Sequence, residues 1–188
     1  MVTTKKSNSR STTRETLLQA AIQVVIDKGV EALTLDAVAQ QAGVSKGGLL
    51  YHFSNKDALI TGMVEQLIRD FEAVLQVEFE QDDAPGTPGQ WLRAYIRATV
   101  RFSKQSLALI ARLFSITVDS PNLFKAAEIY GQQWWQRIET SGIDVTKATI
   151  IQLAIDGLWF SEVFRLGTLD EPHLTQVVET LLDMTRTT

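Results

Sequence analysis

The sequence contains no cysteine, and no stretch of it is apolar for long enough to cross a membrane. Without cysteine the chain can form neither a disulfide nor a thiolate metal site, which favours a reducing compartment, so we expect a cytoplasmic protein. The most apolar stretch, residues 148–160, contains Gln152, Asp156 and Gly157 and is shorter than the roughly 20 residues of a spanning helix. No apolar segment follows the charged first residues, so we expect neither a secretory signal nor membrane association.

Side chains that commonly carry catalysis are also scarce. The two histidines are His52 and His173, and His173 stands beside Pro172, so they can form neither a catalytic triad nor a metal pair at helical spacing. The carboxylate pair Asp82–Asp83 lies in a stretch rich in proline and glycine, and we expect it to be solvated. There is no glycine-rich phosphate-binding motif. We therefore expect no enzyme activity, no metal site and no cofactor.

The charge of the chain is unevenly distributed. The net charge of −4, taken alone, argues against a nucleic-acid-binding protein. However, residues 1–62 carry seven basic and five acidic side chains, a balance of +2. Residues 63–188 carry 11 basic and 17 acidic side chains, a balance of −6. A weakly basic N-terminal part therefore precedes an acidic body.

Apolar residues recur at helical spacing through most of the chain, and no strand pattern or repeat competes with them. With 188 residues, 45% of them apolar, the chain can bury a sizeable core. We therefore predict an all-α fold of about nine helices. The expected helices cover residues 13–28, 35–42, 46–52, 56–75, 88–98, 107–116, 121–138, 145–166 and 174–185. The stretch 81–90, QDDAPGTPGQ, is the clearest break and is predicted to be a connector.

The first three predicted helices are short and closely spaced. Thr34 is expected to cap the second helix, Gly43 to end it in the left-handed conformation, and Ser45 to cap the third. Three short helices in about 45 residues, with a tight glycine turn before the last, are typical of a helix-turn-helix motif, whose later helix enters the DNA major groove. Ahead of them, the basic residues of the first segment could follow the DNA backbone or enter the minor groove, although tails of this kind are more often solvated. These residues are Lys5, Lys6, Arg10 and Arg14.

Two adjacent glycines in the third helix favour DNA binding. Gly47 and Gly48 would leave one helix face without side chains, so that the backbone can approach DNA closely. Lys46 beside them can donate to guanine or to phosphate. On this stretch alone, a loop with a solvated lysine is an equally good interpretation. Phosphate donors nearby favour the DNA interpretation. These donors are Tyr51, His52 and Lys56, of which Lys56 lies at a helix N-terminus that suits an anion.

Residues 13–65 resemble the DNA-binding domain of the tetracycline-repressor (TetR) family. The pattern G-x-x-x-L-T-x-D-x-V-A-x-x-A-G-V-S-K-G-x-L-x-x-H-F-x-x-K-x-x-L reads through residues 29–59. The resemblance implies that Lys46, Gly47, Gly48 and Leu50 face the bases. It also implies a second set, which contacts phosphates: Thr34, Ser45, Tyr51, His52 and Lys56. Many members carry threonine where this chain has Gly48, which leaves fewer side chains for base recognition.

The resemblance further implies a homodimer on a pseudo-palindromic double-stranded DNA operator, and a C-terminal domain that binds a small effector. It divides the chain into a flexible basic arm (1–12), a helix-turn-helix domain (13–60) and an effector-binding and dimerisation domain (61–188). The helices 145–166 and 174–185 would pair with their symmetry mates. The sequence agrees, because the helix 145–166 is apolar on nearly every side and burial is easiest to explain if a second chain covers it.

The effector site is expected among the body helices, and the effector itself is expected to be largely apolar. Asp156 is the expected polar anchor, because a buried carboxylate needs a partner. That partner could be Arg97, Arg101 or Arg112, which we favour, or a cationic ligand. Each candidate aromatic residue, taken singly, is more typical of an ordinary core than of a ligand contact. These aromatic residues are Trp91, Tyr95, Phe102, Phe114, Tyr130, Trp134, Trp159 and Phe160.

The expected function is therefore that of a ligand-responsive DNA-binding transcriptional regulator, in the first place a repressor that a small molecule releases from its operator. The alternative is a helix-turn-helix protein whose body binds a protein partner. A large exposed apolar patch on the dimer would favour this alternative.

Overall fold

The computed structural model describes the backbone of residues 4–117 and 121–186, and all their side chains except those of residues 4–12, 103–105, 107, 114–117, 121–127 and 129. Over these ranges the chain forms eight α-helices and one 3-10 helix and no strand, so the all-α prediction is confirmed. The chain divides into two compact units. The first consists of residues 1–67 and 112–123, and the second of residues 68–111 and 124–188.

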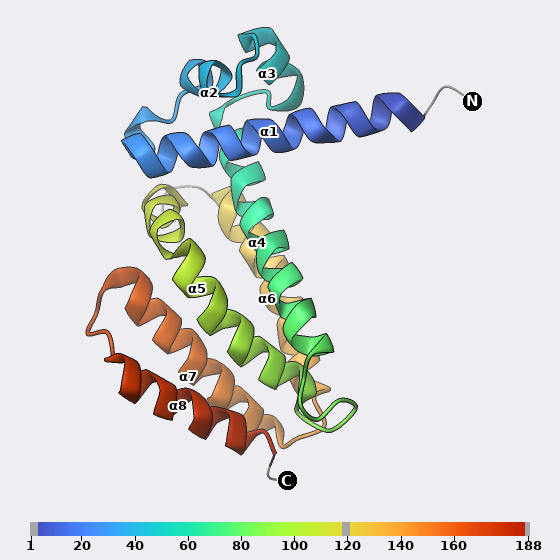
Figure 1. Cartoon of the computed structure of the whole chain (residues 1–188), viewed down its shortest axis with the longest axis vertical. Helices are drawn as coiled ribbons and strands as arrows, with labels where there is room; N and C mark the ends of the chain where they lie inside the picture. The colour runs from blue at the N-terminus through green and yellow to red at the C-terminus, as the bar shows by residue number, and fades with distance from the viewer. Residues whose placement is uncertain (1–3, 118–120, 187–188) are drawn as a thin grey trace. The chain divides into compact units, whose positions relative to one another are not determined.

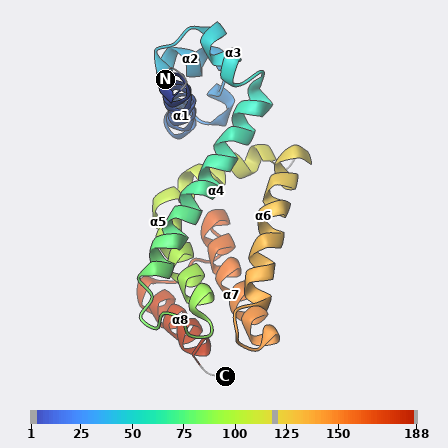
Figure 2. The same ribbon diagram turned by 90° about the vertical axis from the view of Figure 1, so that its right-hand side faces the viewer.

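The first unit is built on the N-terminal helices. Figure 1 and Figure 2 show α1 (Thr4–Lys28) lying along the pair α2 (Leu35–Ala42) and α3 (Lys46–His52), with the start of α4 (Lys56–Glu80) next to them. A short 3-10 helix, η1 (Val30–Ala32), which was not predicted, joins α1 to α2. Side chains from all four α-helices form the core of this unit. They include Leu17, Leu18, Val25, Val38, Leu49, Leu59 and Met63.

The predicted caps of the short helices are confirmed. The Ala37 N–H donates to Thr34 Oγ1 at 3.1 Å, and the Gly48 N–H donates to Ser45 Oγ at 3.1 Å. Gly43 ends α2 with φ 68°, a conformation that glycine adopts without a steric cost. At the start of α4, Asn55 Oδ1 accepts from the Ala58 N–H at 2.8 Å, so Asn55 is the cap.

The expected arm without regular structure is wrong for residues 4–12. Helix α1 begins at Thr4, well before the cap predicted at Thr12 or Thr13. No glycine or proline lies between residues 4 and 28, so no residue in this segment interrupts the helix. Arg14, assigned to the same basic set, packs in the first unit. Its guanidinium carbon lies 5.1 Å from the centre of the Phe53 ring, and its Nη2 lies 3.4 Å from Glu65 Oε2.

Close packing in the first unit depends on Gly62 of α4. A Cβ atom at this position would lie 2.8 Å from Phe53 Cε1 and 3.1 Å from Leu18 Cδ2. Both neighbouring side chains are buried, so neither can move away cheaply. A glycine that costs the helix about 1 kcal/mol in propensity therefore permits α4 to approach its neighbours closely.

The second unit contains the rest of α4, most of α5 (Gln90–Thr117) and of α6 (Pro121–Glu139), and all of α7 (Val145–Phe164) and α8 (Glu171–Met184). In Figures 1 and 2, α7 and α8 lie side by side, and side-chain contacts join α5 to α4, α6 and α7. Helix α5 replaces the two helices predicted over 88–98 and 107–116. Between residues 90 and 117 there is neither glycine nor proline, so one helix continues.

The connector of residues 81–89 is held by a buried ion pair, so the expectation of solvated carboxylates is wrong for Asp82, although Asp83 is exposed as expected. Arg93 is fully buried, and its Nε donates to both carboxylate oxygens of Asp82 at 3.1 and 3.0 Å. Asp82 also accepts from Arg97 Nη1 at 2.9 Å. The exposed Asp83 pairs with Arg97 at 3.0 Å and with Arg186 at 2.6 Å, which ties the end of the chain to the connector.

Helix α7 has one exposed apolar face in the single chain. Ile150, Leu153, Phe160 and Phe164 are 53%, 59%, 45% and 37% exposed, and Gly157 lies in the same row. Their spacing of three and four residues places them in one stripe along the helix. In the single chain this face of α7 is therefore uncovered, and its burial by a second chain stays a prediction.

Candidate DNA-reading head and effector site

The α3 helix presents a small exposed face in the first unit. Leu49 is fully buried and anchors the helix, whereas Lys46, Gly47 and Gly48 are exposed on its first turn. Leu50 is 41% exposed, which agrees with an outward-facing position. A Cβ at position 47 would meet no atom within 4 Å, so the backbone is open there to an approaching surface.

Lys46 is oriented by a carboxylate of the preceding helix. Its Nζ lies 2.9 Å from Asp36 Oδ2, and both side chains are largely exposed, at 55% and 71%. Exposed pairs of this kind contribute about 0–1 kcal/mol, so DNA can compete for the lysine. The sequence motif contains both residues, but only the tertiary structure joins them, across ten positions of the chain.

The residues predicted to contact phosphates lie at helix ends. Thr34 and Ser45 accept backbone hydrogen bonds as caps, which leaves each hydroxyl hydrogen available to donate. Tyr51 is 65% exposed and stands edge-on to His52, with ring centres 5.2 Å apart. Lys56 is exposed on the first turn of α4. The structure thus brings donors from three helices of one unit to exposed positions, with His52 half-buried among them.

The predicted effector residues separate into three groups. The first is an aromatic cluster in the second unit, which we define as Phe71, Trp91, Tyr95, Phe102 and Trp134. Its ring centres lie 5.2–5.9 Å apart, the distances of stacked and edge-to-face pairs. Phe71 of α4 was not predicted as a site residue, because its place in an apolar stripe is equally typical of a core residue.

Asp156 of α7 adjoins this cluster. The Tyr95 hydroxyl donates to Asp156 Oδ1 at 2.7 Å. Burial raises the pKa of Asp156, and hydrogen bonds from Tyr95 and Gln152 only partly offset this effect. Burial and the neighbouring carboxylate raise the pKa of Tyr95 well above 10, so the phenol keeps its proton and remains a donor.

Besides Ser141 Oγ, two buried polar atoms of the second unit have no hydrogen-bond partner among the described residues. They are Trp91 Nε1, a donor, and Gln152 Oε1, an acceptor. Buried polar atoms in folded proteins are nearly always paired, so each of these two needs an explanation. Gln152 was not singled out in the sequence, because an isolated glutamine in an apolar helix carries no distinctive signal.

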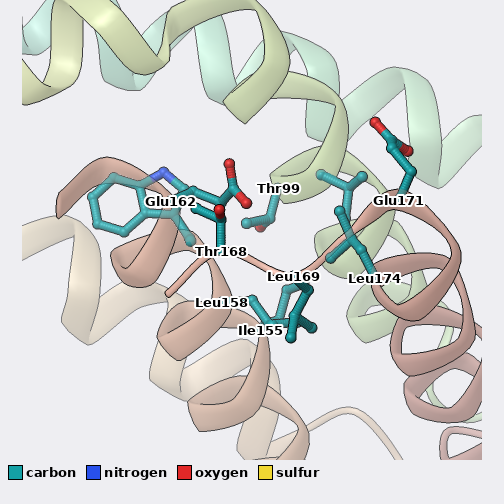
Figure 3. Close-up of a pocket in the computed structure, with 10 residues that line it drawn as sticks. Thr99, Ile155, Leu158, Glu162, Thr168, Leu169, Glu171 and Leu174 are labelled. Atoms are coloured by element: carbon teal, nitrogen blue, oxygen red, sulfur yellow. The ribbon is translucent and has the colours of Figure 1, made fainter. Parts of the chain in front are cut away.

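The second group consists of Trp159, which lines an open pocket of about 380 Å³ in the second unit. Figure 3 shows this pocket, with Leu158, Leu169 and Leu174 among its lining residues and the carboxylates of Glu162 and Glu171 on either side of Thr99. Thr99 also donates to the Tyr95 carbonyl at 2.8 Å, so the pocket adjoins the residues around Tyr95.

The third group comprises Phe160, Tyr130 and Phe114. Phe160 is 45% exposed and packs on Phe164 of the apolar stripe, with ring centres 4.4 Å apart. Tyr130 is half-buried on α6. The Phe114 side chain lies outside the described residues.

Neither a membrane-spanning helix nor a metal site occurs in the part of the chain that the structure describes. None of its helices is both long and apolar enough to span a bilayer. It also contains no group of three or more His, Cys, Asp or Glu side chains arranged to hold a metal ion.

Two family models match this chain. Residues 17–63 match the bacterial regulatory proteins of the tetR family, and residues 89–186, more than half of the chain, match the tetracyclin repressor-like C-terminal domain. The chain belongs to the TetR family. The resemblance seen in residues 13–65 therefore extends to the body of the protein.

Curated proteins are similar to this chain over different lengths. The HTH-type transcriptional regulator RutR of Escherichia coli K12 is 32% identical over 102 residues, which are 54% of this chain and 46% of RutR. The HTH-type transcriptional repressor KstR2 of Mycolicibacterium smegmatis is 40% identical over 58 residues, 31% of this chain and 26% of KstR2. The chain thus spans half or less of the length of these curated relatives.

Solved TetR-like structures confirm the fold. A transcriptional regulator from Rhodococcus sp. Rha1 superposes with a TM-score of 0.69 at 21% identity, covering 92% of this chain and 95% of that one. The multidrug binding protein EbrR, solved in complex with imidazole, superposes with a TM-score of 0.66 at 22% identity, covering 89% and 88%. At this identity the likeness concerns the fold alone.

Proposed function

We propose that the protein is a DNA-binding transcriptional regulator that responds to a small molecule, most simply a repressor that leaves its operator when the effector binds. The observation that carries this proposal is the exposed face of α3. A helix anchored by the buried Leu49 presents Lys46 and two glycines without side chains, as a major-groove reader requires. A protein with this function acts where the chromosome lies, which in a bacterial cell is the cytoplasm.

The chemistry of the exposed residues on α3 and at the neighbouring helix ends suggests which of them would contact DNA. Lys46, with Gly47, Gly48 and Leu50, would face the bases, and Lys46 is the main candidate for a guanine contact. The donors at the helix ends would bind phosphates, which position the head but carry no sequence information. They are Thr34, Ser45, Tyr51, His52 and Lys56.

Dimerisation is supported by the apolar stripe of α7. Four exposed apolar side chains in one row on a helix are unusual in a monomer, and a second copy of the same stripe would bury them. We infer a homodimer through α7 and α8, with two α3 helices about 34–36 Å apart, one turn of DNA. The operator would then be a pseudo-palindrome.

Effector binding would act through helices shared by the two units. Helices α4 and α5 each contribute residues to both units. In the first unit, Arg112 of α5 donates to the Val25 and Ile26 carbonyls near the end of α1, at 2.6 and 2.8 Å. A ligand that shifts α4 or α5 would change the distance between the two α3 helices of the dimer. Operator DNA must then weaken effector binding by the same factor.

The decisive experiment is selection of bound duplexes from a random DNA pool by the purified protein, followed by a salt titration of the enriched sequence. We expect a palindromic sequence and a steep decrease of affinity with salt concentration. If the folded protein enriches no sequence, the proposal is wrong. If effector affinity is unchanged by saturating operator, the DNA function survives but the release mechanism fails.

A further inference from the structure

Asp156 is a half-buried carboxylate without a positive partner among the described side chains. The favoured arginine partners are all engaged elsewhere, so that prediction is wrong. Arg97 pairs with Asp82 and Asp83, and Arg101 pairs with Glu78 at 3.0 Å. Arg112 donates to backbone carbonyls of α1. A carboxylate removed from water without a countercharge is costly, so this position calls for a reason other than stability.

The groups around Asp156 favour the charged form but do not neutralise it. Tyr95 and Gln152 each donate a hydrogen bond to the carboxylate. Both donors are neutral, and both are buried. The negative charge is therefore held in place and oriented, while none of the described side chains around it supplies the positive charge that would balance it.

A second acceptor stands beside the first. Gln152 precedes Asp156 by one helical turn on α7, so the two side chains share a face of the helix. Gln152 is only 5% exposed, and no described residue forms a hydrogen bond with its Oε1. An incoming group that carries two N–H donors could satisfy both oxygen acceptors at once.

The rest of the surroundings is aromatic. The rings of Tyr95, Phe71 and Trp134 pack against one another, with centres 5.3–5.9 Å apart. Aromatic faces attract cations and also bind flat apolar groups. Trp134 and Asp156 both keep part of their surface exposed, so the position is accessible from outside.

We propose that the effector is an organic cation whose charged group carries at least two N–H donors, such as a protonated amine or an amidinium, joined to an aromatic or apolar body. The charge would lie against Asp156, a second N–H would bind Gln152 Oε1, and the body would pack on the aromatic cluster. This proposal rests on the proposed function, because it names the chemical class of the effector. It replaces the expectation of a largely apolar effector with a more specific one.

The test compares four probes that share one ring system. 1-Naphthylmethylammonium has charge and N–H donors, its trimethylated analogue has charge alone, 1-naphthylmethanol is neutral, and 1-naphthylacetate is an anion. Binding to the full chain is measured by isothermal titration calorimetry at fixed pH and ionic strength. We expect the primary ammonium to bind at least about tenfold more tightly than each of the others.

Two variants test whether the positive charge of the probe lies against Asp156 and Gln152. Asp156→Asn should weaken ammonium binding by at least about tenfold and change the affinity for the neutral alcohol by less than about threefold. Gln152→Leu should remove the advantage of the primary over the trimethylated ammonium. The matched control is Glu162→Gln, a carboxylate of the same helix that lines the neighbouring open pocket. This control should leave all four affinities unchanged.

Several results would overturn the proposal. Equal binding of the neutral or anionic probe, no measurable ammonium binding at millimolar concentration, or an ammonium affinity that depends on Glu162 instead of Asp156 each contradicts it. Equal binding of the trimethylated probe contradicts the requirement for N–H donors. None of these results affects the operator selection described above, so failure of the cation site and failure of the regulator function are distinguishable.

Discussion

Arg93 and Asp82 form a buried pair in which Arg93 Nε contacts both carboxylate oxygens and Nη2 donates to Oδ1 at 2.8 Å. The remaining donors of the guanidinium bind Pro88 O, Ala84 O and Thr87 Oγ1 at 2.9–3.0 Å. One side chain thus organises the whole connector between α4 and α5. A lysine could supply the charge but not the planar set of donors.

Loss of this arginine should strongly destabilise the protein. Arg93→Met leaves Asp82 buried without its main partner, and we expect the free energy of unfolding to fall by about 3–5 kcal/mol. Urea denaturation followed by circular dichroism measures the change. The control is Arg101→Met, which removes a more exposed pair with Glu78 and should cost no more than about 1 kcal/mol. Similar losses for the two variants would contradict the role assigned to Arg93.

Replacement of Gly62 tests the close packing in the first unit. Gly62→Ala introduces a Cβ into contact with Phe53 and Leu18, and overpacking of this kind costs about 1–3 kcal/mol. Gly131→Ala is the matched control, because a Cβ at this helical position meets no atom within 4 Å. Its higher helix propensity should stabilise the protein by up to about 1 kcal/mol. Thermal unfolding should therefore shift in opposite directions for the two variants.

Two aspartates should give opposite pH dependences of stability. Burial alone would raise the pKa of Asp82, but hydrogen bonds from Arg93 and the Ala84 N–H outweigh it and lower the pKa. Its stabilisation is therefore present above about pH 4, the unfolded pKa, and is lost as the pH falls through the lower folded value.

For Asp156 the sign is reversed, because its pKa is raised by burial. The folded state binds the proton more tightly, so stability falls as the pH rises from about 4 through the raised pKa. Asp156→Asn should raise the melting temperature at pH 7 and have little effect at pH 3. A variant less stable than the parent at pH 7 would show that the charge stabilises the fold.

Lys46 and Lys56 should affect DNA binding differently. Lys46→Ala should reduce sequence preference by about 1–3 kcal/mol at one base pair, whereas Lys56→Ala should weaken binding to all sequences and lower the salt slope by about one. Asp36→Asn releases Lys46 and removes a negative charge, so non-specific affinity should rise. Fluorescence anisotropy with the operator and with single-base variants measures all three. If Lys46→Ala lowers the affinity for every sequence equally, Lys46 contacts a phosphate and not a base.

A charge in the α7 stripe should separate the proposed dimer. Leu153→Glu places a carboxylate where a 59% exposed leucine would be covered, and desolvation of this charge should raise the dissociation constant by about a hundredfold or more. Analytical ultracentrifugation measures the change. Gln133→Glu on the exposed surface of α6 adds the same charge outside the stripe and is the control. An unchanged dimer would place the interface on another surface.

The local features of this protein could be predicted from its sequence. The cap and turn residues Thr34, Gly43 and Ser45 act on backbone groups within a few positions, so their chemistry is sufficient to place α2 and α3. Helical periodicity likewise predicted α7 and α8 with their approximate limits. It failed between residues 90 and 117, where an interruption was predicted although no helix-breaking residue is present.

Only the tertiary structure decided which charged and polar groups meet. Asp82 looked solvated because its neighbours are polar, yet Arg93, 11 positions away, encloses it. Asp156 has a tyrosine from α5 as its partner, 61 positions away, and not an arginine. Partner choice depends on distances created by folding, and many arrangements are compatible with the same periodicity. The sequence thus determined the helices and the reading motif, whereas packing determined the uncompensated charge of the proposed effector site.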